Sequence, residues 1–143
     1  MHEFDENQDG FSLEALVKKY EGPRIEFYET IVDAISLLEI GIAFVDVASE
    51  KVVYCNQCYS DLMGYKRSEI LGKMSASQLV APESHLFVKR KWHERKEGLK
   101  DARRLEHWGL KKDGTKILFD GAFSMVEGTR NLMMGLLRPI DEN

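Results

Sequence analysis

The segment from residue 52 to residue 72 constrains the fold more than any other part of the chain. It starts with a short apolar run and continues with two patterns typical of very short helices. Asn56 stands where the first helix needs an N-cap, because its side-chain oxygen can accept a hydrogen bond from the free N–H of Cys58 or Tyr59. The apolar run before it therefore ends as a strand, and a helix begins at once.

Two glycines mark the ends of these helices. Gly64 and Gly72 stand where each helix must stop, since the residue after a helix usually adopts a left-handed conformation that glycine adopts at low cost. Helices this short are unstable alone and depend on tertiary packing. The pattern therefore predicts short segments that wrap around a cavity or across a sheet.

Hydrophobic periodicity and turn residues predict the other elements and the fold class. We expect helices at about 12–20, 23–38 and 82–97, and strands at about 42–47, 52–54, 103–111, 116–126 and 132–137. Five strands with helices between the second and third predict an α+β fold built on an antiparallel sheet. Residues 1–38 would form a helical extension that covers the second face of the sheet, and residues 39–143 the main domain.

The strand predicted at 116–126 has two different sides. Ile117, Phe119, Phe123 and Met125 share one side, which we expect to face the core. Gly121 lies between them, and a glycine inside a strand often marks the close approach of a backbone or a ligand. The opposite side is mixed in polarity, as on a partly covered outer face.

Charge is distributed unevenly along the chain, although the net charge is only −4. Residues 1–50 carry twelve acidic and three basic side chains, whereas residues 89–116 carry eleven basic and five acidic ones. These blocks either attract each other, within a monomer or across a dimer, or form separate solvated faces. Trp92 lies inside the basic run, but no nucleic-acid motif accompanies it, so we expect no nucleic-acid partner.

The two cysteines, Cys55 and Cys58, form a single C-x-x-C pattern. Without a second Cys or His pair this pattern is weak evidence for zinc, and the first cysteine closes a strand instead of starting a helix. We interpret both as structural; redox chemistry and a metal or cluster shared between subunits are the alternatives.

Neither calcium binding nor membrane insertion is predicted. Residues 5–10 match the first half of a calcium loop, but Leu16 occupies the position that needs a bidentate glutamate. No apolar run approaches the roughly 18 residues of a membrane span, and the N-terminus is acidic and polar. We therefore expect a cytoplasmic protein without a metal site.

Five short motifs in order resemble the PAS sensor family over residues 36–142. They are Gly41–Asp46, Val52–Asn56, Met63-Gly64-Tyr65, Ser68–Gly72 and Lys112–Thr115. The resemblance implies a cytoplasmic signalling module that holds a small molecule or cofactor between sheet and helices. It also implies dimerisation, often through an N-terminal helix.

The chain departs from the cofactor-binding members of that family, so its cofactor is unknown. Lys73–Gln78 occupies the place where flavin-binding relatives carry a photoreactive cysteine. Lys89 falls near the position of the haem ligand in haem-binding relatives, with His85 and His93 to either side. Both flavin and haem are therefore disfavoured. Pro139 replaces the aspartate that usually passes the signal to a following helix, which puts that hand-off in doubt.

The sequence thus favours a ligand-responsive sensor in two-component regulation, acting as a homodimer through its N-terminal helices on an output kinase or regulator. The candidate ligand-binding residues are Tyr54, Met63, Phe87, Trp108, Phe119, Phe123 and Met134. Six methionines make such a cavity adaptable and favour a small apolar ligand. The alternative is a ligand-free scaffold that mediates protein–protein interaction. No catalytic constellation is recognisable, so we do not expect an enzyme.

Overall fold

The structure is a computed structural model that describes residues 13–20, 22–97, 104–126 and 128–141. These residues form two units, Met1–Ala34 and Ile35–Asn143, which are treated separately. Residue 12, the start of the first predicted helix, and residues 5–10 of the calcium-like pattern lie outside the described residues.

The first unit contains α1 (Leu13–Lys19) and most of α2 (Arg24–Leu37), so both N-terminal helices are confirmed. Ile25, Tyr28 and Ile31 recur at helical spacing along α2 and are exposed in the single chain. A helix usually buries such a stripe. The last residues of α2 belong to the second unit.

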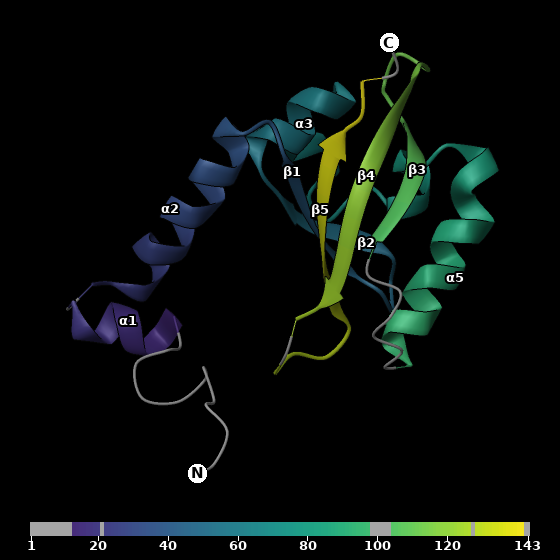
Figure 1. Ribbon diagram of the computed structural model, residues 1–143. Helices are drawn as coiled ribbons and strands as arrows, with labels where there is room; N and C mark the ends of the chain where they lie inside the picture. The colour runs from purple at the N-terminus through teal and green to yellow at the C-terminus, as the bar shows by residue number, and fades with distance from the viewer. Residues whose placement is uncertain (1–12, 21, 98–103, 127, 142–143) are drawn as a thin grey trace. The chain divides into compact units, whose positions relative to one another are not determined.

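The second unit is built on five antiparallel strands in the order β2-β1-β5-β4-β3 (Figure 1). The strands are β1 (Gly41–Asp46), β2 (Lys51–Cys55), β3 (Arg104–Leu110), β4 (Lys116–Met125) and β5 (Leu132–Pro139). Each lies within a few residues of its predicted range. The α+β fold class is therefore confirmed.

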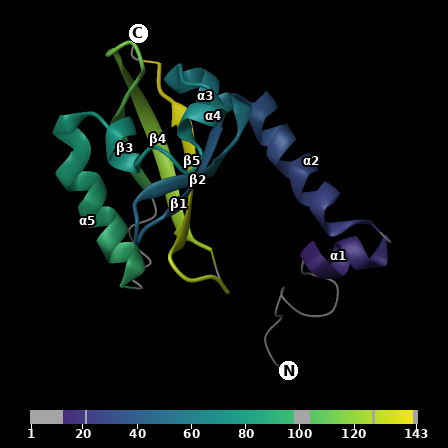
Figure 2. The ribbon, with the colours of Figure 1, turned by 180° about the vertical axis from the view of Figure 1, so that it is seen from behind.

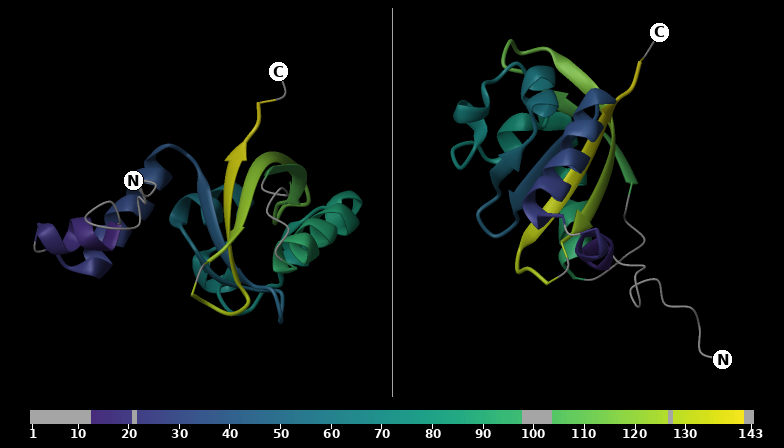
Figure 3. Two further views of the ribbon diagram at one scale, coloured as in Figure 1. Left: turned by 60° about the horizontal axis from the view of Figure 1, so that its bottom comes forward. Right: turned by 90° about the vertical axis from the view of Figure 1, so that its left-hand side faces the viewer.

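The segment between β2 and β3 folds into short helices that lie on one side of the sheet, as the views in Figures 2 and 3 show. They are α3 (Gln57–Met63), α4 (Arg67–Ile70), the 3₁₀ turns η1 (Ala76–Leu79) and η2 (Pro82–Ser84), and α5 (His85–Lys96). Gly64 ends α3 with φ 81°, and Gly72 follows α4 with φ 72°. Both glycines adopt the left-handed conformation expected of them.

The sheet has an inner face toward these helices and an outer face. On β4, Phe119, Gly121 and Phe123 are buried, whereas Ala122 and Ser124 are exposed, so the predicted alternation is confirmed. The buried core joins the inner face to the helices through Tyr59, Met63, Ile70, Leu79 and Val88, among others.

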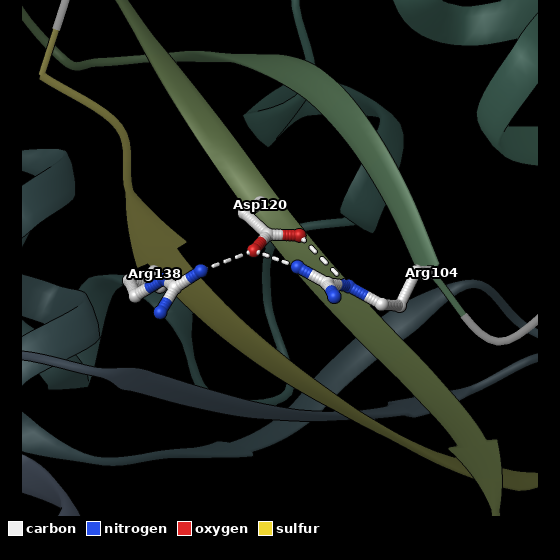
Figure 4. A network of polar contacts seen from close by, with 3 residues as sticks. All are labelled: Arg104, Asp120 and Arg138. Carbon is white, nitrogen blue, oxygen red and sulfur yellow. Dashed lines mark hydrogen bonds and ion pairs between the residues drawn. The ribbon is translucent and has the colours of Figure 1, made fainter.

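The outer face carries a polar network among three strands (Figure 4). Asp120 on β4 accepts hydrogen bonds from Arg104 on β3 at 2.5 Å and from Arg138 on β5 at 2.6 Å. These bonds hold the pKa of Asp120 below its ordinary value despite some desolvation, and the bond from Arg104 has the largest effect. The network ties the three neighbouring strands together on a face that is otherwise largely apolar.

No helix within the described parts of the chain is both long enough and apolar enough to cross a membrane.

Candidate functional site

The candidate site is a small cavity between the inner face of the sheet and the short helices, with a volume of about 30 Å³. This is room for only about one or two water molecules. The lining is mostly small and apolar: Ala43, Val45, Val52, Tyr59, Ala76, Val80, Val88, His107, Phe123, Met133, Gly135 and Leu137. Of the residues that the structure describes, Tyr59 and His107 are the only titratable side chains on this lining.

Glycines shape the wall of the cavity by letting an aromatic ring lie against the sheet. Phe123 packs over Gly121 on its own strand and over its partner Gly135 on β5. A Cβ atom at Gly121 would come within 2.8 Å of the Phe123 ring, and one at Gly135 within 3.0 Å. The close approach predicted at Gly121 is thus made by an aromatic side chain.

In the part of the chain that the structure describes, His107 carries the one fully buried side-chain nitrogen or oxygen atom that has no hydrogen-bond partner. It lies on β3 with 6 % of its surface exposed, and its ring centroid is 5.8 Å from those of both Phe119 and Phe123. Among the described residues, nothing hydrogen-bonds to its buried Nδ1 atom. Burial lowers the pKa of His107 to about 4, against the smaller opposing effect of the nearby Leu105 backbone.

A second buried polar side chain, Asn56, connects the cavity wall to the end of α2. Its Oδ1 atom accepts from the backbone N–H of Tyr59 at 3.0 Å, the predicted N-cap bond, and from that of Ile42 at 2.9 Å. Its Nδ2 group donates to Ser36 Oγ at 2.8 Å and to the Ile40 carbonyl at 3.1 Å. Asn56 therefore holds together α3, β1 and the chain that leaves α2.

A smaller hollow of about 10 Å³ adjoins the cavity on the side of α5. Val80 and Val88 line both spaces, and Ser77, His85 and Lys89 complete the smaller one. His85 Nε2 lies 2.7 Å from the Val80 carbonyl, and Lys89 forms a 3.8 Å ion pair with Glu50. The two valines thus separate the apolar cavity from a more polar hollow.

The structure brings only part of the predicted ligand-binding set together. Phe123 lines the cavity, and Met63 and Phe119 are buried in the surrounding core. Trp108 and Met134 occupy positions that alternate with His107 and Met133, so they lie on the outer face.

Two further members of that set are substantially exposed. Tyr54 is 37 % exposed, with its ring 5.8 Å from that of Phe44, and Phe87 on α5 is 44 % exposed. A role for these residues in ligand binding stays a prediction. The sequence reasoning selected residues for their size, and it missed His107.

The cysteines have the surroundings of structural residues. Both are free; Cys55 is buried and Cys58 half-buried. Burial raises the pKa of each thiol, which lowers the fraction of reactive thiolate. Among the described residues there is no group of three or more His, Cys, Asp or Glu side chains that could hold a metal ion.

The cavity does not fit the large cofactors known from related folds. Pockets that enclose a drug-sized molecule measure about 300–1,000 Å³, against about 30 Å³ here. A flavin or a haem would require displacement of much of the wall. His85 and His93 do not line the cavity either, and His93 lies 3.7 Å from Glu97 at an exposed site.

The chain thus has a five-stranded antiparallel sheet in the order β2-β1-β5-β4-β3, with short helices over one face and a small cavity beneath them. This architecture is that of an α+β sensor-type domain. The model of the PAS fold matches residues 26–139, and the chain belongs to the PAS family. No curated protein matches the sequence.

Solved structures show the same fold at low sequence identity. A PAS domain from Colwellia psychrerythraea aligns with 82 % of this chain and 99 % of its own, with a TM-score of 0.68 and 16 % identity. A domain of a sensor histidine kinase/response regulator from Geobacter sulfurreducens gives 0.62 and 15 %, over 80 % and 96 % of the two chains. A light-oxygen-voltage domain gives 0.60 and 23 %, over 79 % and 86 %.

Proposed function

We propose that this chain is a signal-transduction sensor module that binds a small, mostly apolar molecule beneath its short helices. It would relay binding to an output kinase, a regulator or another partner. One observation carries the proposal: a single side chain, Asn56, bonds both to the Tyr59 backbone at the cavity wall and to Ser36 at the end of α2. A change at the cavity wall can therefore alter the geometry at the end of α2. It carries a signal if the ligand binds two arrangements of that helix end with different affinities.

The experiment that tests ligand binding is native mass spectrometry of the purified protein, together with its absorption spectrum. A bound mass or a visible band is the expected result. A clean apo mass, with no thermal shift across a metabolite library, would contradict the proposal.

A homodimer through the N-terminal helices is part of the same proposal, because α2 leaves Ile25, Tyr28 and Ile31 exposed in the single chain. Deletion of residues 1–34 keeps Ser36 and Ile40, which bond to Asn56, and so leaves that junction in place. We expect the deletion to convert a dimer to a monomer in light scattering. An unchanged mass per particle would refute the role of these helices.

The alternative function, a ligand-free scaffold for protein–protein interaction, is favoured by the small volume of the cavity. About 30 Å³ beneath the helices leaves the core nearly filled. In that case the protein would show no bound mass and no ligand response, yet it would still dimerise.

A further inference from the structure

We propose that His107 recognises the ligand through its Nδ1 atom, and that the ligand is an uncharged, mostly apolar molecule with one hydrogen-bonding group. This inference rests on the proposed sensor function and names the chemistry of its site. It assigns recognition of the ligand to a histidine that lies among apolar neighbours. A choice of binding residues by size or hydrophobicity would not select this side chain.

The first step concerns the unpartnered nitrogen. A buried polar atom without a partner costs free energy, and such atoms are rare in folded proteins. Here the atom belongs to a ring that lies against both Phe119 and Phe123, and only 6 % of the surface of His107 is exposed. Since His107 lines the cavity, a molecule in the cavity is the partner this atom can acquire.

The second step concerns the charge of that molecule. The surroundings keep His107 neutral at neutral pH, because burial disfavours the imidazolium form. A neutral imidazole offers either one donor or one acceptor at Nδ1, depending on its tautomer, and no positive charge. The rest of the lining is apolar apart from Tyr59, so a carboxylate or phosphate would lose its hydration without a counter-charge. A hydroxyl, carbonyl or amide group fits this environment.

The third step concerns space. The cavity of about 30 Å³ must grow to admit more than water, and the valines Val80 and Val88 separate it from the hollow next to α5. Val88→Ala removes two methyl groups from the wall that the two spaces share and so enlarges the cavity. The cost of opening the site is common to all ligands of one shape, so a comparison of two such ligands isolates the contribution of Nδ1.

Phenol and toluene are the probes, because they share a shape and differ in one hydrogen-bonding group. Their affinities would be measured by NMR titration on the full chain, on His107→Phe, which keeps a ring without the nitrogen, and on His107→Asn, which restores a polar group without the ring. Val88→Ala serves as the control that enlarges the space. We expect the phenol-to-toluene affinity ratio to fall about five- to tenfold in His107→Phe, to recover partly in His107→Asn, and to stay unchanged in Val88→Ala.

A readout without any substitution complements the series: the Nδ1 resonance of ¹⁵N-labelled His107 should move with phenol but not with toluene. Binding of both probes with the same ratio in all variants would overturn the inference and leave the sensor proposal standing. An Nδ1 resonance that stays fixed at phenol saturation, because water alone occupies that position, would also overturn it. If neither probe binds the full chain or Val88→Ala, this inference and the small-molecule sensor proposal both fail.

Discussion

The junction around Asn56 and the cavity around His107 are two buried polar regions of one core, and they differ in how completely their polar atoms are paired. Both side chains are almost fully buried, at 3 % and 6 % exposure. Asn56 makes four hydrogen bonds through its side chain, whereas Nδ1 of His107 makes none among the described residues. A complete set of bonds stabilises one structure; an incomplete set leaves free energy that a ligand can recover.

The largest expected effect is at the complete junction. Asn56→Ala leaves the N–H groups of Ile42 and Tyr59, the Ile40 carbonyl and the Ser36 hydroxyl without this partner. We expect a loss of about 4 kcal/mol in the free energy of unfolding, measured with urea, since each unpaired buried group costs about 1–3 kcal/mol and water recovers part.

Asn56→Ser is the matched control for this change. Serine is also a good N-cap and can accept the bond from Tyr59, but it lacks the amide donor to Ser36 and Ile40, so we expect a smaller loss than for alanine. A loss under about 1 kcal/mol for Asn56→Ala would show that the junction contributes no more than an ordinary N-cap.

Acid should affect the cavity region next. The pKa of His107 is about 4 in the folded protein and ordinarily 6.5, so the unfolded chain binds more protons between these values and stability rises with pH there. The contribution of His107 is complete above pH 6.5 and is lost as the pH falls through 4, a difference of about 3 kcal/mol at full protonation.

Unfolding free energies of the wild-type protein and of His107→Phe, measured from pH 7 to pH 3, isolate this effect because all other titrating groups are shared. We expect the wild-type curve to fall more steeply. Parallel curves would mean that the pKa of His107 is not lowered in the folded protein.

Packing around the cavity should give the next largest effect. Gly135→Ala places a Cβ atom within 3.0 Å of the Phe123 ring, which must move toward the cavity. We expect a loss of about 2 kcal/mol, in the range of other overpacked cores. Phe123→Leu in the same protein should relieve most of that loss; additive losses would show that the ring is not the obstacle.

The sequence predicted the junction only where its bonds are local. Asn56 caps a helix three residues on, and such a pattern is readable. Its bonds to Ser36, Ile40 and Ile42 join residues that become neighbours only when β1 folds back onto α3. The positions of the strands along the chain and the inner side of β4 were equally predictable, because two-residue alternation and turn residues are local signals.

The cavity was less predictable, because its wall depends on which side of a strand each residue faces. Leu105, His107 and Gly109 alternate on the inner side of β3, and this period was available in the sequence. The sequence prediction instead selected its larger neighbour Trp108 as a ligand-binding residue, although that position lies on the outer face. The absence of a partner for Nδ1 depends on residues from several strands and helices, and no local pattern encodes it.

The smallest expected effect sharpens the comparison most. At neutral pH, His107→Phe replaces a neutral ring that has an unpaired nitrogen by an apolar ring of similar size, beside Phe119 and Phe123. Removing an unpaired buried polar atom costs little and can stabilise, so we expect the free energy of unfolding in urea to stay within about 1 kcal/mol of the wild-type value, in either direction. A loss as large as that of Asn56→Ala would mean that His107 is also a fully paired structural residue. If stability is unchanged while phenol recognition is lost, the histidine is retained for binding and not for folding.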